Sequence, residues 1–464
     1  MNIRELRQSL ALFIAMWFAC AQSCVAEERP NILLLLADDM GYGELGCYGQ
    51  QMIKTPNIDK LAQNGIRFTD FYAGTSVCSP SRASLQTGKH LGHTTIRGNR
   101  GIWPSDRWAR VPLRHDERTL GDVLRGAGYE TAFIGKWHLD VPDDPSTWAF
   151  ARGFDFAVQP QSGEGFEENV HYVGNRLETF RYEWKDNDCI DSFRTDIALD
   201  YLDDRTWERP LFLVMSYRSP HPREQEIRDR SMYSDRGWPE SERVHAARIT
   251  MLDEQVGRLL ERLEEMGELE NTLVLFTSDN GPHREKGHDH EFFDSNGKFR
   301  GHKRDVYEGG IRVPLIASWP RKIKEGSVSI HVSAFWDVMA TIRDVVGLEA
   351  LPEADGLSFL PALLGEEQPV HDHLYWGIQL DGRWNDMRNG GFRQAVRQGD
   401  WKAVRYGIAN PIELYNLSED PSESRNIVAS HRALGARLGQ LMYREYDDSS
   451  NFPWGGVPSE GPTK

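Results

Sequence analysis

The chain has 464 residues, of which 39% are hydrophobic and 27% are charged, and its formal net charge at pH 7 is −16. These values are typical of a soluble globular protein, and the length suits either one large α/β domain with an appendage or two to three ordinary domains. The negative net charge argues against a general nucleic-acid-binding protein, but it leaves room for a basic pocket.

The first 26 residues have the pattern of a signal peptide. Arg4 and Arg7 precede the apolar run LALFIAMWFACA, and a small-residue site at 24–26 follows it. The run is too short to be a comfortable membrane span, and no later segment is apolar enough to cross a membrane. We therefore expect an exported protein, periplasmic or secreted, that begins near Glu27. Lipidation at Cys24 stays open.

Apolar runs that end in polar residues predict buried strands. They cover residues 32–37, 131–134, 211–215 and 272–276. Helical spacing, caps and terminal glycines predict helices between them, at 57–63, 119–127 and 249–266. This order indicates an α/β fold with a large, mostly parallel sheet sandwiched by helices.

After about residue 365 the pattern changes to short alternating strands. We expect a smaller antiparallel sheet with strands at 373–376, 394–397, 401–406 and 412–417, followed by a helix at about 431–443. The predicted organisation is therefore a signal peptide (1–26), a catalytic domain (27–365) and a C-terminal α+β subdomain (366–464). The loops at 95–115, 141–190 and 282–304 are long enough to shape a site.

A cysteine stands near a predicted helix start in TSVCSPSRASLQTG, residues 75–88. Pro80 with a serine cap predicts the start of this helix, and Gly88 predicts its end. Cys78 would then lie at the positive end of the helix, which favours an anion site or an activated nucleophile. A small buried cysteine that only packs is the alternative. A disulfide between Cys47 and Cys189 would leave Cys78 as a single thiol, which is unusual in an exported protein.

Polar clusters follow the strands, at the edge where open α/β sheets bind ligands. Hard oxygen ligands that suit Ca²⁺ or Mg²⁺ come from Asp38, Asp39, Asp279 and Asn280. Positive charge and proton donors around the same cavity would come from Arg82, Lys136, His138, His221 and Lys303. Such a cavity fits a sulfate or phosphate ester, with His221 held between two prolines as a general acid. Taken singly, each acidic pair is also compatible with a simple turn, and each basic residue with a solvated surface position.

The segment from Cys78 to Arg82, CSPSR, resembles the signature of the formylglycine-dependent sulfatases, the arylsulfatase-like family of the alkaline phosphatase superfamily. Other matching segments follow in order along nearly the whole chain beyond the leader: 30–41, 87–88, 135–138, 219–222, 278–281, 303, 307–314, 399–402 and 413–417. A short motif of this kind alone is weak, but the ordered set is very specific.

The resemblance implies a mechanism. A separate maturation enzyme converts Cys78 to formylglycine, whose hydrate is the nucleophile. One Ca²⁺ is bound by Asp38, Asp39, Asp279, Asn280 and an oxygen of modified Cys78. The resemblance assigns Arg82, Lys136 and Lys303 to the sulfate oxygens. It further implies that His221, with Lys303, protonates the leaving alcohol and that His138 is the base for sulfate release.

The leading prediction is therefore an exported sulfatase that acts on a sulfated carbohydrate. The alternatives are a phosphonate or phosphate ester hydrolase of the same superfamily, and a non-catalytic carbohydrate-binding relative. Loop residues with basic or aromatic side chains are the expected substrate contacts: Arg97, Arg100, Trp103, His171, Arg284, His288, His290 and Arg300. A second metal at His283, His288 and His290 is a less favoured alternative.

Overall fold

The computed structural model describes residues 29–104, 107–160, 168–173, 176–183, 188–222, 227–228, 230–380 and 391–456. The predicted signal peptide, with Cys24, lies outside these residues. Ten strands form a central sheet in the order β13-β2-β12-β11-β1-β10-β6-β7-β8-β9. In chain order their bounds are β1 Asn31–Asp38, β2 Ile66–Phe68, β6 Glu130–Gly135, β7 Phe156–Pro160, β8 Glu168–Val173, β9 Arg176–Arg181, β10 Leu211–Pro220, β11 Thr272–Ser278, β12 Leu315–Ser318 and β13 Ser327–Ser329.

The centre of the sheet is parallel. Strands β11, β1, β10, β6 and β7 run in one direction. β12 is antiparallel to β11, and β8 and β9 add an antiparallel edge. This arrangement confirms the prediction of a large, mostly parallel sheet.

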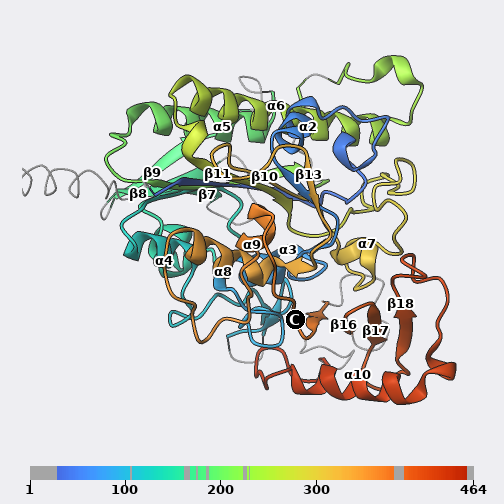
Figure 1. Cartoon of the computed structure of the whole chain (residues 1–464). Coiled ribbons are helices and arrows are strands. Elements are labelled where there is room, and N and C mark those ends of the chain that lie inside the picture. The colour runs from blue at the N-terminus through green and yellow to red at the C-terminus, as the bar shows by residue number, and fades with distance from the viewer. Residues whose placement is uncertain are drawn as a thin grey trace, which may run out of the picture.

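Helices cover both faces of the sheet (Figure 1). One face carries α2 (Pro56–Gln63), α5 (Ile190–Asp204) and α6 (Glu240–Glu265), and the other carries α3 (Cys78–Thr87), α4 (Leu120–Gly126), α8 (Phe335–Val345) and α9 (Leu360–Leu364). Successive side chains of β1 point to opposite faces of the sheet, and each face packs against one layer of helices. Leu34 and Leu36 join the core that contains α3, α4 and α8, whereas Leu33 and Leu35 join the core that contains α2, α5 and α6.

A four-stranded antiparallel sheet follows in the C-terminal part of the chain. Its strands are β15 (Leu374–Gln379), β16 (Phe392–Gln398), β17 (Trp401–Tyr406) and β18 (Glu413–Asn416), and α10 (Arg432–Arg444) packs on it. The other face of this sheet packs on Tyr72, Ile311 and Trp336, which precede it in the chain. Ile311 ends the short helix α7 (Glu308–Ile311). The predicted hairpin is confirmed, because β16 and β17 join through Gly399 and Asp400.

Two local expectations were wrong, and one open question is answered. α3 begins at Cys78, with Val77 at its cap position and no side-chain cap, so the serine cap near Pro80 does not form. The sequence left open whether Cys47 and Cys189 form a disulfide, and both are free. Within 141–190 the structure contains β7, β8 and β9 where a long loop was expected, because the edge strands alternate too many polar residues to give an apolar run.

Smaller elements complete the framework. β3 (Phe71–Tyr72) pairs with β14 (Ser333–Ala334), and β4 (Gly101–Ile102) pairs with β5 (Trp108–Ala109). In the part of the chain that the structure describes, no helix is both long enough and apolar enough to cross a membrane.

Candidate active site

The acidic residues converge because their strands are neighbours. Ala37 of β1 pairs with Ser278 of β11 in a parallel ladder, so the residues that follow both strands leave the sheet at one edge. The Asp39 N–H donates to Asp279 Oδ1 over 3.0 Å, and Asp39 adopts a left-handed backbone with φ of 69°. The carboxylates of Asp38, Asp39 and Asp279 are fully buried.

The helix α3 brings Cys78 to these carboxylates. Its Sγ lies 3.5 Å from Asp38 Oδ1 and 3.9 Å from Asp39 Oδ1. One ligand atom from each of Asp38, Asp39, Cys78 and Asp279 lies within 4.8 Å of the others. Burial raises the pKa of the Cys78 thiol to about 12, with Lys136 acting in the opposite direction. The buried thiol therefore favours its protonated form.

The donor set fits a hard cation. Asn280 Nδ2 donates to Asp39 Oδ1 over 2.8 Å, whereas Asn280 Oδ1 is buried and has no hydrogen-bond partner. A buried carbonyl oxygen without a partner is costly, and a cation is the kind of group that would satisfy it. Three carboxylates and one amide oxygen are ligands that Ca²⁺ prefers. The residues present therefore fit the implied metal.

Four buried cations surround the carboxylates. Lys136 Nζ lies 2.8 and 2.7 Å from the two oxygens of Asp38, and Lys303 Nζ lies 2.6 Å from Asp39 Oδ2. Arg82 Nε donates to Asp279 Oδ2 over 2.8 Å. Arg218, which the sequence analysis missed, donates from Nη1 to Asp38 Oδ2 over 2.9 Å.

These cations set the protonation of the carboxylates. Burial opposes the effect, but Lys136 and Arg218 hold the pKa of Asp38 below its ordinary value. Burial raises the pKa of Asp279 to about 6 and also raises the pKa of Asp39, against the attraction of Arg82 and Lys303 respectively. Burial would lower the pKa of Lys303, but the combined attraction of Asp39, Cys78 and Glu285 raises the pKa above its ordinary value. Four cations around three carboxylates thus leave positive charge in the site that can attract an anionic ligand.

The two predicted histidines border the same cluster. His221 Nε2 lies 3.7 Å from Asp39 Oδ2, and the Nδ1 atoms of His221 and His138 are buried without a hydrogen-bond partner. Burial lowers the pKa of both imidazoles well below the ordinary value, reinforced by Arg218 for His221 and by Lys136 for His138. Both imidazole rings therefore favour the neutral form in the absence of a bound anion.

A second missed residue positions the loop that carries His221. Asp191, in the first turn of α5, accepts the backbone N–H of Arg218 over 2.7 Å and that of Ser219 over 2.8 Å. Asp191 is fully buried. Its only signal in the sequence is an acidic residue at a helix start, which is too common to indicate a site.

The expected substrate contacts do not form one group. The Ser79 N–H donates to Asn99 Oδ1 over 3.1 Å, which ties the loop that carries Arg100 and Trp103 to the start of α3. Trp103 is 37% exposed. By contrast, the guanidinium of Arg300 stacks 3.8 Å from the ring centre of Tyr307.

Several other expected contacts are engaged in the fold. Arg97 is buried, donates to Thr94 O over 2.9 Å and stacks on Tyr446 at 4.3 Å. His171 packs on Phe156, with ring centres 4.6 Å apart. The remaining members of the expected set are placed as follows: Arg284 is exposed, and His288 and His290 are buried.

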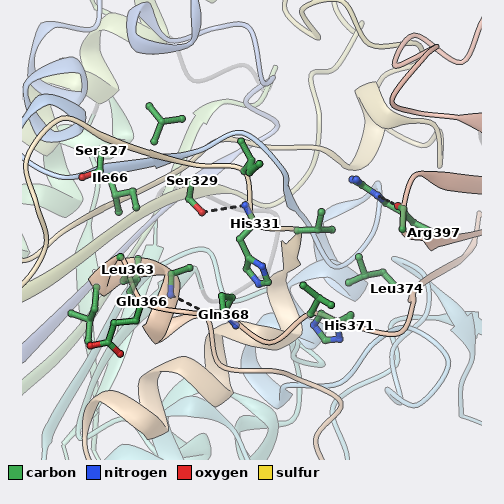
Figure 2. Close-up of a pocket in the computed structure, with 18 of the residues that line it drawn as sticks. Ile66, Ser327, Ser329, His331, Leu363, Glu366, Gln368, His371, Leu374 and Arg397 are labelled. Atoms are coloured by element: carbon green, nitrogen blue, oxygen red, sulfur yellow. Dashed lines mark hydrogen bonds between the residues drawn. The ribbon is translucent and has the colours of Figure 1, made fainter.

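A separate cavity of about 860 Å³ lies beside β13, α9 and β15. Figure 2 shows its walls, which include Ile66, Leu363 and Leu374 with His331 and His371. No residue of the acidic and basic cluster lines it, so this cavity is distinct from the candidate active site.

Comparisons with known proteins agree with this geometry. A family model described as Sulfatase matches residues 30–348, and one described as N-sulphoglucosamine sulphohydrolase, C-terminal, matches residues 289–444. N-acetylgalactosamine-6-sulfatase of Sus scrofa is 33% identical over 92% of this chain and 82% of its own length. Arylsulfatase A of Bos taurus is 30% identical over 94% of this chain and 93% of its own length.

A solved structure has the same fold. The crystal structure of Ps i-CgsB in complex with k-i-k-neocarrahexaose superposes with a TM-score of 0.78 at 26% identity, covering 94% of this chain and 96% of that one. The fold and the polar cluster define a hydrolase of the alkaline phosphatase superfamily that acts on sulfuric esters. The chain belongs to the sulfatase family.

Proposed function

We propose that the chain is an exported sulfatase that hydrolyses a sulfate ester of a sulfated carbohydrate, with a formylglycine made from Cys78 and one Ca²⁺. The observation that carries the proposal is the convergence of Cys78 with three buried carboxylates inside a ring of four buried cations. A compact anion is the ligand that such a ring attracts.

The metal site is assigned to Asp38, Asp39, Asp279 and Asn280, completed by an oxygen of modified Cys78. When bound, the metal would supply charge neutralisation to the sulfate oxygens, and the formylglycine would supply a hydrated aldehyde as nucleophile.

Lysine and arginine side chains stabilise the reacting group. Lys136 and Lys303 now bind the carboxylates of Asp38 and Asp39, and a metal on those oxygens would release both ammonium groups toward the sulfate. Arg82 is held by Asp279 and also donates from Nη1 to Lys136 O over 2.6 Å, which fixes its guanidinium beside residue 78. It would orient the hydroxyls of the modified residue.

Two histidines handle protons in the proposal. A bound sulfate anion would offset the cations that lower the pKa of His221 and so favour its protonated form. In that form His221, beside Lys303 through their shared partner Asp39 Oδ2, would deliver a proton to the leaving alcohol. His138, whose backbone oxygen accepts from Ser79 Oγ over 2.7 Å, lies next to residue 78 and would act as base when sulfate is released. Its lowered pKa leaves the imidazole neutral and able to accept a proton.

The substrate class rests on the loops and on the relatives. The loop of Arg100 and Trp103, which is tied to the start of α3, is where we place the sugar. Two relatives are named for sulfated sugars or solved with one, which supports a carbohydrate substrate for this chain as well. A maturation enzyme acting on Cys78, and a periplasmic or secreted location, are parts of the same proposal.

Paired rate measurements test the proposal. The purified protein, co-expressed with a formylglycine-generating enzyme, should release sulfate from a panel of sulfated mono- and oligosaccharides and should hydrolyse an aryl sulfate faster than the matching aryl phosphate. Dominant phosphatase activity would favour the phosphate or phosphonate ester hydrolase instead. Binding of the same sugars without any turnover by fully converted protein would favour the carbohydrate-binding relative.

A further inference from the structure

A group of buried acidic and imidazole side chains lies behind the active site, between α6 and the segment at 282–304. It consists of Glu44, Glu242, His245, His283 and His288, and we name it the imidazole bridge. Each member is at most 6% exposed. None of these residues belongs to the proposed metal site.

Two carboxylate–imidazole pairs form the centre of the bridge. His245 Nε2 lies 2.6 Å from Glu44 Oε1, and His288 Nδ1 lies 2.6 Å from Glu242 Oε2. The two rings stack with centres 3.6 Å apart and planes at 11°. His283 stands edge-on to both rings, at 5.1 Å from His245 and 5.0 Å from His288.

Glu44, His245 and His288 bring one potential ligand atom each within 4.8 Å of one another, but the orientation of the two rings disfavours a shared metal ion. An imidazole binds a metal along a lone pair in the plane of its ring, with a bond of about 2.0–2.1 Å. The rings of His245 and His288 are almost parallel and stacked, so their in-plane lone pairs do not meet at one point. The less favoured alternative of a second metal at His283, His288 and His290 finds no support either, because His290 packs on His302 with ring centres 4.8 Å apart and, among the described residues, these three histidines do not form a group of potential metal ligands.

Instead, the outer atoms of the bridge hold backbone groups of the active-site segments. Glu44 Oε2 accepts the Gly41 N–H over 2.7 Å, two residues after Asp39. Glu242 Oε1 accepts the Asp289 N–H over 2.9 Å, within the segment that leads to Lys303.

A third contact reaches the loop of the proposed general acid. His283 Nε2 lies 3.3 Å from Pro220 O, next to His221. The bridge thus joins the segments that follow β1, β10 and β11, each of which supplies residues to the proposed active site.

The charge state of the bridge is suited to this task. Burial would raise the pKa of Glu44, but the combined effects of His245, His288 and Ser295 hold the pKa below its ordinary value. Burial lowers the pKa of His245, and the stacked His288 adds to the effect. Glu44 is therefore a buried carboxylate that accepts the Gly41 N–H and pairs with His245 Nε2.

We propose that Glu44, His245 and His288 are positioning residues of the sulfatase site, which hold the Asp38–Asp39 turn in the geometry that binds the metal. The proposal rests on the proposed function for the identity of the metal. Partners that orient metal ligands from behind typically change metal affinity by about 10–100-fold when they are removed. The hydrogen bond from His245 to Glu44 is the central link, because its loss leaves a buried carboxylate with a single donor.

The test compares His245→Leu with His245→Gln in the full-length chain. A glutamine amide reaches about as far as imidazole Nε2 and can still donate to Glu44. We expect His245→Leu to weaken calcium binding, measured by isothermal titration calorimetry, by about 10–100-fold. We expect His245→Gln to restore the affinity to within about threefold of the starting protein.

A matched control lies on the same helix. Asp253 of α6 is fully buried and accepts the Ile58 N–H over 2.7 Å, but it anchors α2 and not the active site. Asp253→Leu should lower the melting temperature and leave the calcium affinity of the folded protein unchanged. An equal loss of affinity in Asp253→Leu and His245→Leu would reduce the bridge to a general contribution to stability and overturn the proposal.

Hydrogen exchange separates this proposal from the proposed function. In metal-free protein, His245→Leu should speed amide exchange at Gly41 and Asp289 by at least tenfold, while Asp253→Leu leaves both amides unchanged. If the starting protein binds no calcium, the metal assignment is wrong, and exchange at these two amides still decides on the bridge. Unchanged exchange at both amides in His245→Leu would overturn it.

Discussion

Lys136 provides the most informative perturbation of the charged cluster. Its ammonium group makes two contacts of 2.7 and 2.8 Å with Asp38, and both side chains are buried. Removing one partner of a buried ion pair costs about 3–5 kcal/mol. Arg218 remains at 2.9 Å from Asp38, so we expect Lys136→Met to lose about 3 kcal/mol of the free energy of unfolding in metal-free protein.

Calcium should change that loss. A divalent ion on Asp38 supplies the charge that the lysine provided, so the calcium-loaded variant should lose only about 1 kcal/mol. The difference of about 2 kcal/mol corresponds to calcium binding about 30-fold tighter in Lys136→Met, since no ammonium group competes for the carboxylate. Activity should nevertheless fall by about 10²–10³ in kcat, because a group that stabilises the sulfate is lost.

The assay is denaturant or thermal unfolding of both proteins with and without calcium, combined with a calcium titration. Lys60→Met is the matched control, since Lys60 is exposed on α2, and we expect it to change stability by less than about 0.5 kcal/mol. Equal losses for Lys136→Met with and without calcium would refute the reasoning, because they would mean that Asp38 does not bind the metal.

Three further predictions concern pH, the leaving group and the cysteines. Burial raises the pKa of Glu423 from 4.5 to about 7, so its contribution to stability is complete below pH 4.5 and is lost as the pH rises through about 7. Glu423→Gln should therefore flatten the fall in melting temperature between pH 5 and 8. An unchanged slope would contradict this prediction. His221→Gln should lower kcat by about 10²–10⁴ for a sulfated sugar but much less for nitrophenyl sulfate, whose leaving group needs no proton, and equal losses would remove His221 as the acid. Because Cys47 and Cys189 are free, a reducing agent should leave the melting temperature unchanged, and a drop of several degrees would reveal a disulfide.

The sequence predicted the parts of the fold that a local pattern encodes. The run at 32–37 is apolar on both faces, as a strand covered by helices on both sides must be, and it corresponds to β1. The polar residues after β1 and β11 were predicted to lie close together, because neighbouring parallel strands end at the same edge of a sheet. The edge strand β9 was missed because none of its residues is buried, so it contains no apolar run.

Site residues could be predicted only where they stand in a distinctive sequence motif. Cys78, Arg82 and Lys136 stand in short distinctive motifs, and the structure brings all three together. Arg218 sits inside a strand, where an arginine carries no signal by itself. His288 was assigned to substrate because it lies in a polar loop. Its partner Glu242 lies in helix α6, and a contact between residues so far apart in the chain cannot be read from a single sequence.

The most direct test of the central claim is the mass of the peptide that contains residue 78, measured on protein co-expressed with a formylglycine-generating enzyme and compared with its sulfatase activity. We predict that the peptide carries an aldehyde in place of the thiol and that sulfate release rises in proportion to the converted fraction. An unconverted thiol in protein that hydrolyses sulfate esters at full rate would contradict the account.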